Sequence, residues 1–327
     1  MSLADLRSGV TIVGMDESWD CIVVGAGAAG LSAALVLGRA RRHTLVIDAG
    51  RPSNLASHGI GGLLGHDGRP PAGFYAAGRE ELARYPSVVV RDGEVVDGRR
   101  DGHGHGLVVT LADDTRETAR RVLLATGMDY RFPARPGLAE RWGRTVFHCP
   151  FCHGWEVRDR PLGVLDRGDG GVHRALLLRA WSDDVTLYAD GPAELEDAQR
   201  AQLEGAGIAV DERPVAGLRG DAPDLTAVAL AGGAERACGG LLVPVTLHQR
   251  SDLARRLGAT TAAVNPLSAE AIVVDAQMST DVCGLSAAGD ASGQMPSVAN
   301  AIAAGSTAAA MLVGGLMTEA FAAPAPA

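Results

Sequence analysis

The segment His148-Cys149-Pro150-Phe151-Cys152-His153 holds the residues best suited to chemistry in this chain. Two cysteines separated by two residues can close a small disulfide ring and reopen it, so the pair can carry two electrons. The histidine beside each cysteine provides a proton acceptor whose pKa lies near neutrality. The sequence therefore predicts a thiol–disulfide redox site, and the next question is which molecule exchanges electrons with it.

A nucleotide-binding unit is predicted near the start of the chain. The apolar run 20–24 leads into Gly25-Ala26-Gly27-Ala28-Ala29-Gly30, then a helical segment over 31–41 and a second strand, 44–47, that ends at Asp48. Strand, GxGxxG, helix, strand and acid in this order are typical of a βαβ unit that binds a dinucleotide. The glycines permit a tight turn and close approach of a pyrophosphate, which the helix N-terminus then faces. Asp48 is placed to accept hydrogen bonds from a ribose.

Two motifs further along favour FAD as that dinucleotide. A strand over 121–124 ends in Ala125-Thr126-Gly127, and a strand over 285–288 ends in Gly289-Asp290. A long Ala/Gly-rich helix is predicted to follow, from about 298 to 316. These pieces look like the Ala-Thr-Gly and Gly-Asp motifs of flavoproteins with two dinucleotide sites. That likeness implies that Asp290 holds the ribityl–pyrophosphate region and that the helix points its N-terminus at the flavin.

Length, charge and composition limit the class of protein. A chain of 327 residues is long enough for two domains. Its net charge of −9 disfavours nucleic acid and anionic membranes as partners. No stretch is expected to reach the length of a transmembrane helix, and acidic residues interrupt the N-terminal segment, so we expect no signal peptide and a cytoplasmic protein. Residues 1–18 and the tail 321–327 are expected to be disordered.

Five cysteines in a chain of this length do not make a disulfide scaffold. Cys21, Cys238 and Cys283 stand alone beside apolar residues and are predicted to be small buried core residues. In a reducing compartment, the close Cys149–Cys152 pair is better explained as catalytic than as structural. A haem attachment site and a zinc site are weaker interpretations. Haem attachment needs export, and adjacent His-Cys and Cys-His pairs cannot easily complete one tetrahedron, so no metal is predicted.

The order of these motifs resembles the low-molecular-weight thioredoxin reductases over nearly the whole chain. The resemblance implies an α/β flavoprotein with two dinucleotide-binding domains: a split FAD domain of Rossmann type over 19–154 and 250–320, with a smaller inserted NADPH-type domain over 155–249. It also implies a homodimer and backbone contact between Val95 and the adenine. The cofactor-binding residues predicted in this way are Gly25, Gly27, Ala28, Ala29, Gly30, Asp48, Ala49, Val95, Ala125, Thr126, Gly127, Gly289, Asp290, Val298 and Ala299.

The inserted domain departs from that family at its own nucleotide loop. The stretch Gly163-Val-Leu-Asp166-Arg-Gly168-Asp169-Gly-Gly-Val-His173 carries Asp166 where the first glycine of GxGxxG is expected. A carboxylate at a turn that admits a pyrophosphate repels it and fills the space. The positions that should supply arginines for a 2′-phosphate are acidic instead: Asp190, Glu194, Glu196 and Asp197. The sequence therefore predicts a degenerate NADPH site.

Without NADPH, electrons are expected to enter at the cysteines. The pattern His-Cys-Pro-aromatic-Cys-His-Gly with a decayed NADPH loop resembles the thioredoxin-reductase-like dithiol oxidases of natural-product pathways, which close the disulfides of gliotoxin, holomycin and related antibiotics. The reductases carry Asp after the second Cys and a small residue before the first. The resemblance implies that a small dithiol reduces the Cys149–Cys152 disulfide, that FAD accepts the electrons, and that O2 reoxidises FAD to give H2O2.

Each residue of the motif is given an expected role. Cys152 should lie against the flavin and pass the electrons on, while Cys149 should face the substrate and form the mixed disulfide. His153 is the leading base, with His148 as a helper. His58, in a Gly-rich loop with His66, either lines the substrate cavity or lies in an exposed turn. Two other functions stay open: a disulfide reductase fed by NADPH or ferredoxin, and a non-catalytic FAD-binding redox sensor.

Overall fold

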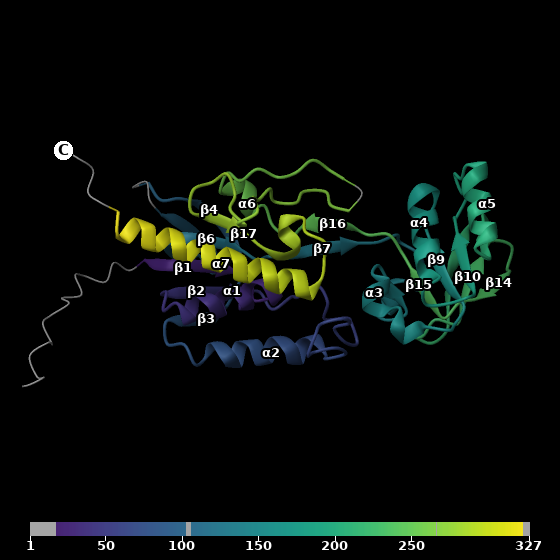
Figure 1. Cartoon of the computed structure of the whole chain (residues 1–327), viewed down its shortest axis with the longest axis horizontal. Coiled ribbons are helices and arrows are strands. Elements are labelled where there is room, and N and C mark those ends of the chain that lie inside the picture. Colours follow the sequence, from purple (N-terminus) through teal and green to yellow (C-terminus); the bar gives the residue numbers. More distant parts are fainter. Residues whose placement is uncertain (1–17, 103–105, 266, 323–327) are drawn as a thin grey trace, which may run out of the picture.

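The computed structural model describes residues 18–102, 106–265 and 267–322. They form two units, with the Rossmann-type unit at one end of the molecule and a smaller unit at the other (Figure 1). The predictions for residues 1–17 and 323–327 concern residues outside this description. The elements of the first unit are β1 (Trp19–Val24), α1 (Ala28–Arg39), β2 (Thr44–Asp48), α2 (Pro71–Leu82), β3 (Val88–Asp92), β4 (Val95–Arg100), β5 (Leu107–Leu111), β6 (Arg116–Leu124), α6 (Leu253–Arg256), β17 (Leu285–Ala287) and α7 (Val298–Ala320).

The first unit is built on a seven-stranded sheet of order β3-β2-β1-β6-β5-β4, with β17 added to the end of β6. Strands β1, β2, β3, β6 and β17 run parallel, and β4 and β5 continue the sheet antiparallel. One face is covered by α1, α2 and α7, whose small apolar side chains pack over β1 and β2. The other face is covered by α6 and by the irregular segment that follows it, which contributes Leu257, Ile272 and Val282. This confirms the predicted α/β fold class.

The second unit begins after a two-stranded connection. Its elements are β8 (Val146–Phe147), α3 (Pro150–His153), β9 (Leu162–Leu165), α4 (Gly168–Leu178), β10 (Val185–Tyr188), α5 (Asp197–Gly205), β11 (Ile208–Asp211), β12 (Val215–Arg219), β13 (Ala227–Leu230), β14 (Glu235–Ala237) and β15 (Gly240–Leu242). A parallel sheet of order β11-β10-β9-β15-β8 has α4 and α5 on one face and the antiparallel β12-β13-β14 sheet on the other. The inserted unit is therefore a three-layer α/β body of its own.

The chain passes between the units through β7 (Met128–Arg131) and β16 (Thr246–Gln249), which pair antiparallel. The predicted boundary put residues 132–154 with the first unit. The structure instead pairs β8 with β15, and Phe147 packs in the core of the second unit. A two-residue strand carries little signal of its own, and its partner lies almost a hundred positions away. The redox helix α3 is thus attached to the inserted unit and faces the first.

Helix α7 corrects one sequence expectation. It runs for 23 residues and is long and apolar enough to cross a membrane by length and composition, although no such stretch was expected. Within the described residues it is a core helix of the first unit, because Ala304, Ala308 and Leu316 are buried against neighbouring elements. Packing against α1 explains the apolar residues of its buried stripe.

Candidate active site

The predicted redox pair lies at the start of α3. Cys149 is the N-cap residue, Pro150 occupies the first helical position, and Cys152 follows one turn later. Proline at that position keeps the turn rigid, since its fixed φ suits a helix start and its missing N–H would have no partner there. Cys149 and Cys152 form a disulfide and line a cavity of about 670 Å³. The short helix therefore presents the sulfur pair to that cavity.

The remaining cysteines differ in exposure. Cys21 and Cys238 are buried as predicted, and burial raises the pKa of each thiol to about 12, so neither forms a thiolate readily near neutral pH. Cys283 is exposed, which contradicts the prediction. It lies in the turn that leads into β17, where the neighbouring Leu285, not the cysteine, enters the core.

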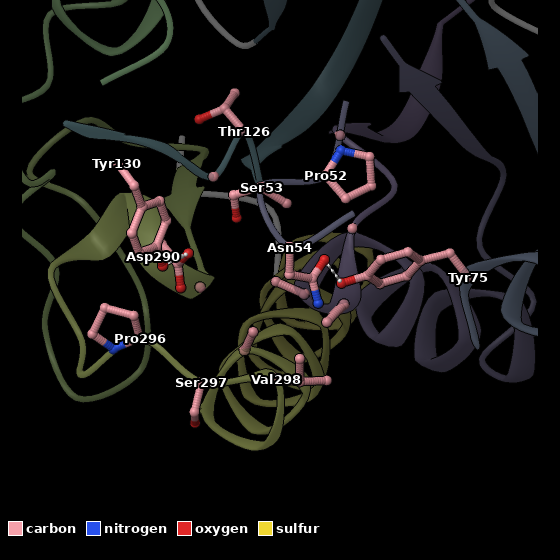
Figure 2. Close-up of a pocket in the computed structure, with 18 of the residues that line it drawn as sticks. Pro52, Ser53, Asn54, Tyr75, Thr126, Tyr130, Asp290, Pro296, Ser297 and Val298 are labelled. Carbon is pink, nitrogen blue, oxygen red and sulfur yellow. Dashed lines mark hydrogen bonds between the residues drawn. The ribbon is translucent and has the colours of Figure 1, made fainter. Parts of the chain in front are cut away.

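The cavity joins the motifs that were predicted separately. Figure 2 shows Tyr130 and Asp290 on one side, Asn54 and Tyr75 on the other, and the first turn of α7 with Val298 between them. Fourteen of the predicted cofactor residues line the cavity: Gly25, Gly27, Ala28, Ala29, Asp48, Ala49, Val95, Ala125, Thr126, Gly127, Gly289, Asp290, Val298 and Ala299. The four predicted catalytic residues, Cys149, Cys152, His148 and His153, line it as well.

The glycine turn has the form that a pyrophosphate requires. Gly25 has φ +102°, a conformation that side chains disfavour. Nothing lies within 4 Å of where a side chain on Gly27 would begin, so the backbone there is open to the cavity. Gly30 does not line the cavity but lies behind it, where any side chain would overlap the carbonyl of Gly25. The turn therefore leaves room for phosphate groups directly before α1.

Asp48 lines the cavity, as expected for a residue that binds a ribose, but both of its carboxylate oxygens already have partners within the protein. One accepts a hydrogen bond of 3.1 Å from the backbone N–H of Ala26, and the other pairs with Arg79. The carboxylate thus holds the glycine turn against the end of β2, while it still lines the cavity. It links the nucleotide end of the cavity to α2 through Arg79.

Asp290 also lines the cavity and is bound by a residue that sequence reasoning missed. The hydroxyl of Tyr130 donates a 2.7 Å hydrogen bond to Oδ2 of Asp290. Burial raises the pKa of the Asp290 carboxyl, and the Tyr130 hydrogen bond opposes that shift. Ser297 caps α7 by accepting a hydrogen bond of 3.0 Å from Asn300 N, so the helix begins at the cavity wall. A buried acid beside an open helix N-terminus suits the polar chain of FAD.

The donors and spaces of this cavity fit FAD. The open glycine turn, the buried carboxyl of Asp290 and the redox disulfide all line the same space. When bound, FAD would be held by the turn at Gly25–Gly30, the Ala125–Gly127 segment and the start of α7.

His148 lies in an aromatic pocket beside the disulfide. Its ring centre is 4.9 Å from that of Tyr130 and 5.7 Å from that of Trp142, to which it is nearly parallel. Burial, with a smaller contribution from the nearby His153, lowers the pKa of His148 to about 4. Desolvation penalises the charged imidazolium, so this ring is neutral near pH 7.

His153 is held between the two units. Its ring stacks on Phe147 at 5.7 Å, and its Nε2 lies 3.2 Å from the hydroxyl of Ser57 in the first unit. Burial lowers the pKa of His153, while the carbonyls of Cys149 and Gly143 and the charge of Glu156 raise it by smaller amounts. At neutral pH the ring is therefore uncharged and able to accept a proton.

Several cavity residues had no signal in the sequence. Ser57, Asn54 and Tyr75 come from the loop after β2 and from α2, and Tyr75 donates a 2.9 Å hydrogen bond to Asn54 (Figure 2). Only the family resemblance indicated that this loop runs past the site. His58, which was left open, is exposed and lies 3.1 Å from the guanidinium of Arg144, and it is not among the cavity-lining residues.

The second nucleotide loop, between β9 and α4, is closed by charge pairs. Oδ1 of Asp166 accepts a hydrogen bond of 2.9 Å from the N–H of Arg167, and Oδ2 pairs with Arg174 at 2.5 Å. Gly170 faces the same carboxylate, because a side chain there would begin 2.9 Å from Oδ2 of Asp166. The carboxylate therefore lies in the space between the strand end and the first turn of α4.

The acidic residues beyond β10 are used within the second unit. Asp190 accepts a 2.7 Å hydrogen bond from Val215 N and pairs with Arg135, and Glu194 pairs with Arg167 at 3.4 Å. Asp169 accepts a hydrogen bond of 2.6 Å from Gln199, next to the helix cap at Glu196. Arginines near this loop thus already have acidic partners.

The sequence matches the Pyridine nucleotide-disulphide oxidoreductase family over residues 19–305. Thioredoxin reductase sirT of Leptosphaeria maculans is 30% identical over 304 residues, which cover 89% of this chain and 92% of that protein. The chain spans about half the length of two other thioredoxin reductases that it matches. For those from Arthroderma benhamiae and Claviceps purpurea the identities are 35% and 34%, over 55% and 54% of this chain and 45% and 57% of theirs.

Solved structures of oxidoreductases are also similar to this chain. An oxidoreductase from Agrobacterium tumefaciens superimposes with a TM-score of 0.86 at 34% identity and covers 92% of this chain and 99% of its own. The structure of HlmI superimposes with a TM-score of 0.86 at 36% identity, covering 95% of this chain and 96% of that one. The predicted resemblance to thioredoxin reductases is confirmed. The chain belongs to the pyridine nucleotide-disulphide oxidoreductase family and is a thioredoxin reductase-like flavoprotein.

Proposed function

We propose that this protein is an FAD-dependent dithiol oxidase that closes an intramolecular disulfide in a small dithiol metabolite, with O2 as electron acceptor. The observation that carries the proposal is the contrast between the two nucleotide loops. The loop at Gly25–Gly30 is open and shares a cavity with the Cys149–Cys152 disulfide, whereas the loop at Asp166 is filled by a carboxylate bound to Arg174. Electrons then enter at sulfur.

The first chemical step uses the disulfide and His153. His153 accepts the proton of one substrate thiol, and the resulting thiolate attacks the Cys149 sulfur. A substrate–Cys149 bond forms, the Cys149–Cys152 bond breaks, and Cys152 leaves as a thiolate. A neutral histidine is needed for this step, which the lowered pKa of His153 provides.

The second substrate thiol then attacks the mixed disulfide. The substrate disulfide forms, Cys149 leaves, and both enzyme cysteines are reduced. When bound, FAD would take two electrons from this cysteine pair and transfer them to O2. The net reaction is R(SH)2 + O2 → R(S–S) + H2O2, in which the two substrate protons appear in the peroxide. His148 and His153, both lining the cavity, are the residues that we propose carry those protons.

A small apolar substrate is supported by the side chains at the cavity. Phe151, between the two cysteines, lines the cavity, is 70% exposed and contacts Trp181 edge to face at 5.5 Å. Met295, also a lining residue, is 75% exposed. Large apolar side chains at the mouth of a site favour an apolar ligand over water. We propose a heterocyclic dithiol of the dithiolopyrrolone or epidithiodiketopiperazine class, in antibiotic maturation or self-resistance.

An anaerobic reduction experiment tests this function. The yellow protein is mixed without O2 with dithiothreitol in one cuvette and with NADPH in another, and flavin absorbance is followed. We expect rapid bleaching by the dithiol and none at a catalytic rate by NADPH. The variant Cys152→Ser should keep bound FAD and lose bleaching by the dithiol. Rapid bleaching by NADPH would favour the reductase that the relatives' names suggest. A Cys152→Ser protein that behaves like the wild type towards the dithiol would favour a non-catalytic FAD-binding sensor.

Two further proposals concern assembly and location. We propose a homodimer, because thioredoxin reductase-like flavoproteins often form one. We propose a cytoplasmic site of action, since the unpaired cysteines Cys21 and Cys238 suit a reducing compartment. Sedimentation of the yellow protein tests the first proposal, and fractionation of the producing cells tests the second.

A further inference from the structure

Ser57 has a single hydroxyl proton, and its use is fixed by geometry. The hydroxyl lies 2.7 Å from the carbonyl oxygen of Gly59 and 3.2 Å from Nε2 of His153. A carbonyl oxygen can only accept, so the proton of Ser57 must point to Gly59. The oxygen of Ser57 then faces the histidine with lone pairs alone. Nε2 must therefore carry a hydrogen for this contact to be a hydrogen bond.

The other ring nitrogen of His153 is left without a partner. Nδ1 is buried and makes no hydrogen bond within the described part of the chain. Buried polar atoms without partners are rare and call for an explanation. One explanation is that Nδ1 is the nitrogen that accepts a proton. The carbonyls of Cys149 and Gly143 raise the pKa of His153 and so favour the protonated ring.

We propose that Ser57 is a positioning residue that holds His153 as its Nε2–H tautomer and so leaves Nδ1 as the basic atom. This inference rests on the proposed function, in which His153 accepts the substrate proton. Ser57 touches neither the disulfide nor the thiol in this account, and it acts through His153.

The contact joins the two units of the molecule. Ser57 belongs to the loop between β2 and α2 of the first unit, and His153 ends α3 of the second. The same loop touches α3 again at Gly61, where a side chain would begin 2.5 Å from the carbonyl oxygen of Cys152. The base is therefore set in its tautomer only while the disulfide lies against the flavin cavity.

The charged surroundings of His153 do not explain the tautomer. Glu156 raises the pKa of His153. His148 lies close enough to His153 that His153 lowers the pKa of His148. Neither is recorded in a hydrogen bond to the ring, whereas Ser57 is. The hydroxyl alone distinguishes one nitrogen from the other among the described side chains.

The direct test is the tautomer itself. Nitrogen NMR of flavin-loaded protein with labelled histidine separates a protonated Nε2 from a bare Nδ1 and does not depend on activity. We expect the Nε2–H form in the wild type, the same in Ser57→Thr, and a mixture of tautomers in Ser57→Val, which matches threonine in shape without a hydroxyl. A wild-type Nδ1–H form, or a pure Nε2–H form in Ser57→Val, overturns the inference.

The kinetic test asks whether Ser57 acts through His153. Anaerobic flavin reduction by dithiothreitol should be about tenfold slower in Ser57→Val than in Ser57→Thr, the loss expected for one hydrogen bond. In a His153→Gln background the same pair should differ little, because interacting residues are non-additive. An equal loss in both backgrounds would assign Ser57 a structural role and overturn the inference. Leu64→Ala, on the same loop and 98% exposed, is the matched control.

The two proposals fail in different ways. A wild type that no dithiol reduces would reject the dithiol oxidase, while the NMR result would still decide the tautomer. A wild type that dithiothreitol reduces, with Ser57→Val equal to Ser57→Thr in tautomer and rate, would reject only the role of Ser57.

Discussion

Burial of His148 predicts a loss of stability in mild acid. The pKa of this histidine is about 4 in the folded protein, against 6.5 for an unperturbed side chain. Between these values the unfolded chain binds the proton and the folded protein does not, so folding is penalised as pH falls below 6.5. The stability is complete above that pH. This is the sign expected for a base whose folded pKa is depressed.

The size of the effect follows from the two pKa values. Linkage gives a loss of about 1 kcal/mol at about pH 5.5 and about 3 kcal/mol well below pH 4. His153 adds to the loss in the same direction, since burial lowers its pKa as well. His148→Gln cannot charge, so it should remove the part of the loss that belongs to His148.

Urea unfolding followed by tryptophan fluorescence measures this loss. Trp142, Trp155 and Trp181 lie in or beside the second unit, and Trp142 is stacked near His148, so the signal reports the region concerned. Wild type and His148→Gln are compared at about pH 7.5 and about pH 5.5, with His173→Gln, on an exposed residue of α4, as control. A stability difference between wild type and His148→Gln that is the same at both pH values would show that His148 is not buried in neutral form.

Three further results are expected. Gly30→Ala should purify with little FAD, because its methyl group would overlap the Gly25 carbonyl behind the phosphate turn; flavin absorbance per protein measures this. His153→Gln should slow anaerobic flavin reduction about a hundredfold. It should also remove the fall in rate that we expect for the wild type below about pH 6.5, because the lowered pKa of His153 places that fall on the acid side. Phe151→Ala should lower kcat/KM for ring-bearing dithiols about tenfold, while kcat/KM for dithiothreitol changes little. Trp155→Ala, which lies away from the cavity lining, should behave like wild type. Equal losses for both kinds of dithiol would contradict a ring contact.

The nucleotide turn could be predicted because its signals are local. Gly25, Gly30 and Asp48 lie in one βαβ unit whose order and spacing are fixed by strand and helix geometry. Gly289-Asp290 was equally readable, since a strand precedes it and a helix follows. Together with the family resemblance, this reasoning named fourteen residues that line one cavity.

The partners of those residues could not be predicted, because they come from elsewhere in the chain. Ser57 and His153 are 96 positions apart, and Tyr130 and Asp290 are 160 apart. The unit boundary failed for the same reason: β8 is two residues long and is defined only by its pairing with β15. The prediction that Cys283 is buried was wrong for a different reason, because apolar neighbours do not decide which side chain of a turn faces the core.

The position of the redox helix gives these features one physical explanation. Because α3 belongs to the inserted unit, every contact that brings the disulfide to the flavin cavity is a contact between units, including Ser57 with His153 and Gly61 with Cys152. Such contacts are made and lost together if the units move about β7 and β16. A base whose tautomer is set across that boundary is ready only when the disulfide is also in place. Proton uptake by His153 and electron transfer from Cys152 would then require the same arrangement of the two units.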